Sequence, residues 1–145
     1  MAEELLRQTY PIHGGDFDKA GETATAIKRI LSVLDIDSNI VHRTVVIAFE
    51  AEMNVVMYAR EAVLTFILTD HDITLQVKDK GPGIENIELA MTEGYSTATD
   101  KMREMGFGFG MGLPNIRKNS DQFNLESEVG VGTTLSAVIR LNSHG

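Results

Sequence analysis

Apolar residues recur at helical spacing in two segments of the N-terminal half of the chain. The first segment runs from a capping aspartate, Asp16 or Asp18, to about Leu34, and the second runs from about Asn39 to Ala59. Because residues three or four positions apart fall on one face of a helix, each segment predicts an amphipathic helix that packs on a core. The expected core stripe of the second helix consists of Val45, Phe49, Met53 and Val56.

Alternation of apolar and polar residues predicts strands in much of the remaining chain. The expected strands cover residues 4–12, 62–69, 73–79, 121–128 and 132–141, and short helices are expected at residues 85–91 and 113–119. Pro11 suits an edge strand because proline cannot donate a hydrogen bond to a neighbour. This order of elements predicts an α/β two-layer sandwich, with the helices packed on one face of a mixed sheet.

Composition and charge narrow the class of protein. A chain of 145 residues with 43% hydrophobic and 23% charged residues is typical of one globular domain. The formal net charge of −8 argues against nucleic acid or an anionic membrane as a partner. The chain has no cysteine, and it shows neither an apolar run of membrane-spanning length nor the apolar core of a signal peptide. We therefore expect a cytoplasmic protein.

One carboxylate occupies an inward position at the end of a strand. The inward row of residues 73–79 ends in Asp79, and a carboxylate on the buried side of a strand needs a partner. Gly81-Pro82-Gly83 follows, and glycine lets a ligand approach the backbone closely. The exocyclic amino group of adenine could satisfy Asp79, whereas the carbonyl oxygen of guanine would be repelled. The alternative is an ordinary turn in which Asp79 accepts hydrogen bonds from nearby backbone.

A second polar pair lies on the second predicted helix. Glu50 and Asn54 are four residues apart and therefore share one face, with Tyr58 one turn further along. These residues could simply form a solvated face. Alternatively, the carboxylate could act as a base beside an amide oxygen that binds a hard cation such as Mg²⁺.

A third set consists of alternating glycines directly before a predicted helix. Gly106, Gly108, Gly110 and Gly112 are separated by large apolar residues, and the stretch 92–112 lacks periodicity, which indicates a mobile loop. Backbone N–H groups at the start of a helix suit a phosphate. A flexible surface loop without a ligand is the alternative.

In this order and spacing, the three sets resemble the ATP-binding boxes of the GHKL superfamily, which includes gyrase, Hsp90, histidine kinases and MutL. Within it, residues 79–97 are most similar to the small bacterial anti-sigma factor and stressosome switch serine/threonine kinases. The resemblance implies a Bergerat, histidine-kinase-like ATPase fold in which residues 1–145 form a single ATP-binding kinase domain. An ATP lid is expected at about residues 92–109.

The resemblance also implies roles for single residues. Glu50 would be the general base, Asn54 would bind Mg²⁺, and Asp79 would bind the adenine amino group. Thr133 or Thr134 would lie near Asp79. Further nucleotide contacts are expected from Gly81, Gly83, Ile84, Gly106, Gly108, Gly110 and Gly112, and Lys101 and Arg103 are candidates for the γ-phosphate.

Two positions depart from the pattern of these families. Met57 stands where histidine kinases commonly carry a lysine, which argues against a histidine kinase. Ala59 replaces a glycine often found in the switch kinases, which leaves the local geometry open.

The implied function is an ATP- and Mg²⁺-dependent serine/threonine kinase of a partner-switching pathway. Its substrate would be a STAS-type anti-sigma-factor antagonist or scaffold protein. One alternative is an anti-sigma factor that mainly sequesters a sigma factor under nucleotide control. Another is a detached histidine kinase ATPase domain, although the first predicted helix contains no histidine. A homodimer is possible within the family.

Overall fold

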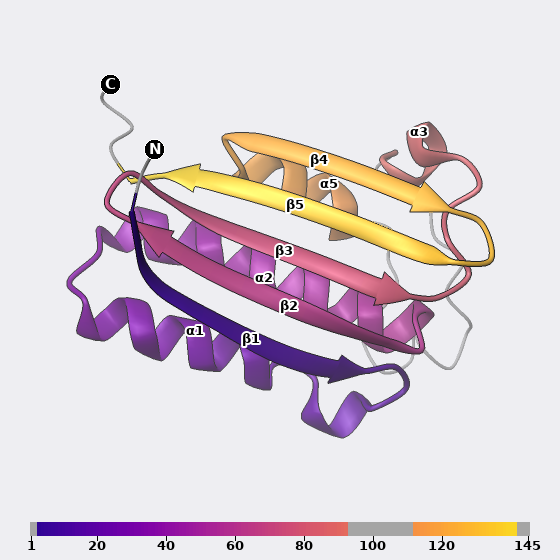
Figure 1. Ribbon diagram of the computed structural model, residues 1–145, viewed down its shortest axis with the longest axis horizontal. Coiled ribbons are helices and arrows are strands. Elements are labelled where there is room, and N and C mark those ends of the chain that lie inside the picture. The colour runs from indigo at the N-terminus through magenta and orange to yellow at the C-terminus, as the bar shows by residue number, and fades with distance from the viewer. Residues whose placement is uncertain (1–2, 93–111, 142–145) are drawn as a thin grey trace.

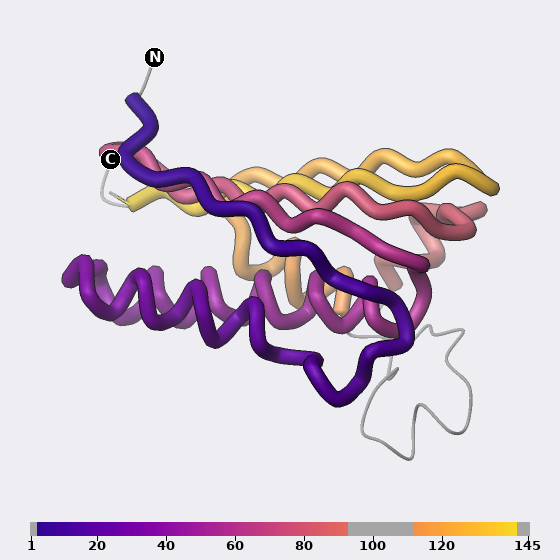
Figure 2. The backbone as a smooth tube through the Cα atoms, turned by 60° about the horizontal axis from the view of Figure 1, so that its bottom comes forward, coloured from indigo at the N-terminus to yellow at the C-terminus, as the bar shows by residue number. Residues whose placement is uncertain are grey.

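The computed structural model describes residues 3–92 and 112–141, which form a five-stranded sheet covered by helices on one face (Figure 1). The strands are β1 (Glu4–His13), β2 (Glu61–Thr69), β3 (Asp72–Lys80), β4 (Gln122–Glu128) and β5 (Gly132–Arg140). The helices are η1 (Phe17–Lys19), α1 (Glu22–Val33), α2 (Ser38–Tyr58), α3 (Ile87–Ala90) and α5 (Gly112–Asn119). Figure 2 shows α1, α2 and α5 in one layer and the sheet in the other, which confirms the two-layer sandwich.

The expectation of a mixed sheet is wrong for the described strands. Their order is β1-β2-β3-β5-β4, and every pair of neighbours is antiparallel. The short helix η1 and the two α-helices α1 and α2 connect β1 to β2, and β2 runs opposite to β1. β3 and β4 do run the same way, as a helical crossover predicts, but β5 lies between them (Figure 1). The sheet is therefore antiparallel throughout the described strands because β5 separates the two parallel strands.

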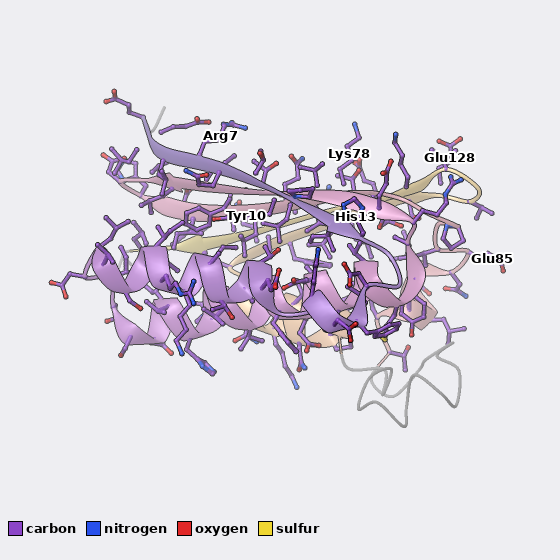
Figure 3. The ribbon with its side chains drawn as sticks, turned by 90° about the horizontal axis from the view of Figure 1, so that it is seen from below. Arg7, Tyr10, His13, Lys78, Glu85 and Glu128 are labelled. Carbon is purple, nitrogen blue, oxygen red and sulfur yellow. The ribbon has the colours of Figure 1, made fainter. Side chains whose placement is uncertain are left out.

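Alternate residues of the strands face the helices and form the core. Phe66 of β2, Leu75 of β3 and Ile139 of β5 are almost fully buried. None of the described helices lies on the opposite face of the sheet (Figure 2). Arg7 and Lys78 lie on that open side, whereas Tyr10 points toward the helices (Figure 3).

The predicted core stripe of α2 is correct for two of its residues. Met53 and Val56 are buried, but Val45 is half-buried and Phe49 is 40% exposed. The helix instead faces the core with Ile40, Thr44, Ile47, Ala48, Ala51 and Val55. Because α2 contacts α1, α5 and the sheet, apolar residues occur on most of its sides, and helical spacing alone does not identify the side that faces the sheet.

A buried carboxylate of α2 caps the N-terminus of α1. The backbone N–H groups of Thr23 and Ala24 each donate to one carboxylate oxygen of Glu52, both at 3.2 Å. The residue before the helix, Gly21, has no side chain to serve as a cap and adopts a left-handed φ of 101°. Glu52 is 3% exposed and supplies the missing acceptors from another helix. Sequence reasoning missed this residue.

Replacing Glu52 by alanine should destabilise the fold, because two buried N–H groups would lose their acceptor. We expect the free energy of unfolding of Glu52→Ala to fall by about 2 kcal/mol or more. Urea denaturation followed by circular dichroism measures this change. Glu126→Ala, at an exposed position of β4, should change it by less than about 0.5 kcal/mol. Equal effects of the two substitutions would contradict the capping role.

Candidate functional site

Glu50 and Asn54 lie on the face of α2 that meets the start of α5. A Cβ atom on Gly112, the first residue of α5, would lie 3.1 Å from Asn54 Oδ1 and 3.4 Å from Glu50 Oε2. The Asn115 side chain donates a hydrogen bond to Glu50. Both residues are only partly exposed and lie against α5. The start of α5 therefore packs closely on both polar groups, at a position where only glycine avoids a tight contact.

Burial shapes the chemistry of Glu50. Desolvation of its half-buried carboxylate raises the pKa of Glu50, and the hydrogen bond from Asn115 opposes that rise by favouring the charged form. A carboxylate with a raised pKa accepts a proton more readily than an exposed one. Sequence reasoning missed Asn115, because a polar residue on a short helix carries no signal by itself.

Arg43 of α2 holds the other end of α5. Its Nε donates to the carbonyl of Asn119 at 2.9 Å, and its Nη2 pairs with Asp121 at 3.0 Å. The second carboxylate oxygen of Asp121 accepts from the backbone N–H of Arg140 at 2.7 Å. Arg43 stands two helical turns before Glu50 on α2. One helix therefore contacts both ends of α5, and no local pattern of residues predicts the contact of Arg43.

Asp79 occupies the inward position that the strand pattern predicts. It is half-buried, and its Oδ1 accepts from the backbone N–H of Thr133 at 3.0 Å. Burial raises the pKa of Asp79, and the hydrogen bond from Thr133 opposes that rise. Of the two threonines considered, Thr133 is thus the one beside Asp79. Thr134 pairs with the exposed Lys78 and belongs to the open face of the sheet.

The Gly81-Pro82-Gly83 segment is hydrogen-bonded to the turn between β4 and β5. Gly81 N–H donates to Val131 O at 3.3 Å, and Gly130 N–H donates to Pro82 O at 2.8 Å. Gly83 has a φ of +76°, and a Cβ there would lie 2.4 Å from Glu128 O. Glycine is required at this position both by conformation and by space. The segment is therefore a fixed loop beside Asp79.

Two further predicted residues lie in the same region. The backbone N–H of Ile84 donates to Ser127 Oγ at 2.7 Å. Ala59, which replaces a glycine of the switch kinases, has φ −100° and ψ 166°, an extended conformation that alanine adopts without strain. A Cβ on Gly81 would lie 3.1 Å from Ala59 Cα, so the end of α2 packs closely on the loop. The local backbone therefore accommodates alanine at position 59.

Several predicted residues cannot be placed. Lys101, Arg103, Gly106, Gly108, Gly110 and nearly all of the expected lid, residues 92–109, lie outside the described residues. Within residues 3–92 and 112–141, no helix has the length and apolar character needed to cross a membrane.

The sandwich, the strand-end carboxylate and the polar pair facing a glycine at a helix start together define the class of protein as a GHKL-type nucleotide-binding domain. The chain belongs to the family described as histidine kinase-, DNA gyrase B- and HSP90-like ATPases, whose model matches residues 39–143. Its curated relatives include anti-sigma F factors and a serine/threonine-protein kinase.

Three curated relatives illustrate the kinship. The serine/threonine-protein kinase RsbT of Bacillus subtilis is 38% identical over 61 residues, 42% of this chain and 40% of that protein. The anti-sigma F factor of Clostridium acetobutylicum is 35% identical over 91 residues, 59% of this chain and 60% of that protein. The anti-sigma F factor of Anoxybacillus flavithermus is 27% identical over 139 residues, 96% and 84% of the two chains. The matches to the first two relatives thus span less than two thirds of those proteins.

A solved structure shares the fold. A chain in the crystal structure of the SiaB–SiaC complex from Pseudomonas aeruginosa superposes with a TM-score of 0.62 at 15% sequence identity, covering 94% of this chain and 89% of that chain. At this identity the similarity concerns the fold alone.

Gly83→Ala should destabilise the protein more than Gly130→Ala does, although both glycines have a left-handed φ. Gly130 has φ +81° and no atom within 4 Å of a Cβ, so alanine there should cost about 1 kcal/mol from backbone strain alone. At Gly83 the Cβ also meets the Glu128 backbone, which should bring the loss in unfolding free energy to about 3 kcal/mol or more. Urea denaturation compares the two variants, and equal losses would contradict the close packing.

Asp79→Asn should stabilise the ligand-free protein at neutral pH. Because the folded-state pKa of Asp79 is raised, its charged form costs stability above that pKa, and the cost disappears below the unfolded pKa of about 3.9. Asparagine removes the charge but keeps an oxygen for the Thr133 N–H. The gain should therefore be present at pH 7 and shrink as the pH falls toward 4.

Urea denaturation from pH 4 to pH 8 measures the stability gain of Asp79→Asn. Glu85→Gln removes an exposed charge and serves as the control, which should change the free energy of unfolding by less than about 0.5 kcal/mol. An Asp79→Asn variant that is less stable than the wild type at pH 7 would show that the carboxylate is needed for folding.

Proposed function

We propose that the protein is an ATP-dependent serine/threonine protein kinase of a bacterial partner-switching pathway, with a STAS-type anti-sigma-factor antagonist as its substrate. The observation that carries the proposal is the placement of Glu50 and Asn54 against Gly112 at the start of α5. This arrangement brings a proton acceptor, an amide oxygen and a helix N-terminus to one point. Those are the groups that phosphoryl transfer to a hydroxyl requires.

ATP fits the described residues in two places. Asp79 keeps a half-buried carboxylate beside the Gly81-Pro82-Gly83 loop, and a carboxylate can accept a hydrogen bond from the amino group of adenine. The start of α5, an eight-residue helix that contacts Arg43 and Asn115, lies beside Glu50 and Asn54, and its backbone N–H groups suit a phosphate. We assign Gly81, Gly83, Ile84 and Thr133 to the surroundings of the base.

Mg²⁺ would suit Asn54, whose side-chain oxygen lies beside the start of α5. Mg²⁺ commonly takes one or two protein oxygens and completes its octahedron with phosphate oxygens and water. Within the described residues, no cluster of three His, Asp or Glu side chains could hold a metal ion. Bound Mg²⁺ would neutralise phosphate charge, and Asn54 would fix its position. We expect the four glycines up to Gly112, with Lys101 and Arg103, to complete the phosphate site.

Glu50 is the proposed general base. Its carboxylate would orient the hydroxyl of the substrate serine or threonine and accept its proton as the phosphoryl group is transferred. Asn115 keeps the carboxylate oriented, and burial raises the pKa of Glu50 toward a value useful for a base. Because the base must be ionised, transfer should slow as the pH falls through that raised pKa.

The relatives support the class of partner. One is named a serine/threonine-protein kinase and two others are named anti-sigma F factors, and the structural neighbour was solved in complex with a second protein. We infer a cytoplasmic switch that phosphorylates an antagonist protein as a single domain of residues 1–145. The anti-sigma F names also favour a second function, the nucleotide-dependent sequestration of a sigma factor.

Glu50→Gln should separate nucleotide binding from catalysis. Glutamine preserves the shape of the side chain but cannot accept the proton, so phosphoryl transfer should fall at least about 100-fold. Stabilisation by Mg-ATP should persist, at about 2.7 kcal/mol when ATP is present at 100 times its Kd. The measurements are transfer of radiolabelled phosphate to STAS-type proteins encoded near the gene, and thermal unfolding with Mg-ATP or Mg-GTP.

The outcomes of this experiment are distinct. Transfer by the wild type to a serine or threonine, lost in Glu50→Gln, supports the kinase. Stabilisation by ATP without transfer to any such protein favours sequestration. An equal response to ATP and GTP would contradict adenine recognition by Asp79. Full transfer activity in Glu50→Gln would assign the base to another residue.

A further inference from the structure

Three polar side chains occupy inward positions at the same end of the sheet. Asp79 ends the inward row of β3, Ser127 ends that of β4, and Thr133 begins that of β5. All three are half-buried, whereas their neighbours Lys78, Lys80 and Glu126 are exposed. Polar groups at inward positions need hydrogen-bond partners. The proposed function uses Asp79 and Thr133 but gives Ser127 no role.

Ser127 joins two segments that border Asp79. Its Oγ accepts from the backbone N–H of Ile84 at 2.7 Å, and it lies 2.9 Å from Thr133 Oγ1 and 3.2 Å from Gly132 O. Thr133 in turn donates its backbone N–H to Asp79 Oδ1 at 3.0 Å. A continuous set of hydrogen bonds therefore runs from the Gly83–Ile84 loop through Ser127 and Thr133 to the carboxylate.

The loop itself has little freedom to move away from Ser127. Gly83 packs against the Glu128 backbone so closely that a Cβ would lie 2.4 Å from Glu128 O. A Cβ on Gly132 would lie 2.1 Å from Asp79 O, so β5 approaches β3 equally closely at this end. Ser127 thus lies between two tight backbone contacts, and its hydroxyl is placed by both.

The single proton of the Ser127 hydroxyl has two possible acceptors. If it goes to Thr133 Oγ1, the proton of Thr133 is free to donate to another group. If it goes to Gly132 O, Thr133 donates to Ser127 and offers only its lone pairs. The ionised Asp79 beside it can only accept. Adenine presents an amino donor next to a ring-nitrogen acceptor, so an accepting Asp79 and a donating Thr133 complement it.

We propose that Ser127 is a positioning residue for purine selectivity, because its hydroxyl ties the Ile84 backbone to Thr133 and so orders the groups around Asp79. The inference rests on the proposed ATP site. Loss of the Ser127 hydroxyl would leave the Ile84 N–H without this acceptor and Thr133 without this partner. The preference for a base with a 6-amino group should then weaken.

The test compares two nucleotides that differ in that amino group. ATP and purine riboside triphosphate, which has hydrogen in its place, are titrated by calorimetry with Mg²⁺ against the full chain. Ser127→Thr keeps the hydroxyl. Ser127→Val introduces a side chain of nearly the same shape as threonine but without the hydroxyl. Ser136→Ala, which removes a hydroxyl from the open face of β5, is the matched control. Urea denaturation of each variant records its stability.

The wild type should bind ATP at least roughly tenfold more tightly than purine riboside triphosphate, since Asp79 offers a charged acceptor. Ser127→Val should reduce this ratio several-fold to roughly tenfold. Ser127→Thr and Ser136→Ala should retain the ratio. Where Ser127→Val does not fold, Ser127→Ala provides the same comparison with a smaller side chain.

Two results would overturn the inference in different ways. If Ser127→Val weakens the binding of both nucleotides equally, the ratio of the two affinities is unchanged and Ser127 merely supports the loop. If the wild type binds ATP but shows no preference for it, adenine recognition by Asp79 fails first, and the selectivity role of Ser127 fails with it. An unchanged ratio in Ser127→Val beside a clear wild-type preference leaves the ATP site intact and removes only the role of Ser127.

Discussion

A half-buried carboxylate at the end of a central strand constrains one whole end of this molecule. Asp79 cannot be left without a partner, and the backbone N–H of Thr133 satisfies one of its oxygens. That contact requires β5 to approach β3 closely, which Gly132 permits because it has no Cβ. Gly83 permits the same closeness between the following loop and Glu128. The glycines around the site therefore permit the close backbone contacts that surround the carboxylate.

Helix α2 organises the rest of the site, because successive residues of a helix point in different directions. Glu50 and Asn54, one turn apart, face α5, whereas Glu52, about 200° away around the axis, reaches α1 and caps it. Arg43, two turns before Glu50, donates a hydrogen bond to the carbonyl of Asn119 at the far end of α5. The same helix thus supports the core, fixes its two neighbouring helices and presents the proposed catalytic carboxylate.

The proposed recognition and the proposed chemistry belong to separate clusters. The cluster around Asp79, proposed to bind the base, is built from strand ends and a glycine loop. The cluster around Glu50, proposed to act on phosphate, is built from the helices α2 and α5. The close contact of Ala59 with Gly81 joins them, because the end of α2 packs on the loop that follows Asp79. A nucleotide that spans both would couple selectivity to transfer.

The sequence by itself determined the elements and the inward position of Asp79, because strand parity and helical spacing are local properties of the chain. The same parity could have found Ser127, which continues the inward row of Phe123 and Leu125. Only the tertiary structure decided that β5 lies between β3 and β4, that Phe49 is exposed, and that Glu52 serves another helix. Those outcomes depend on which helix and strand faces pack against one another, and residues far apart in the chain determine this packing together.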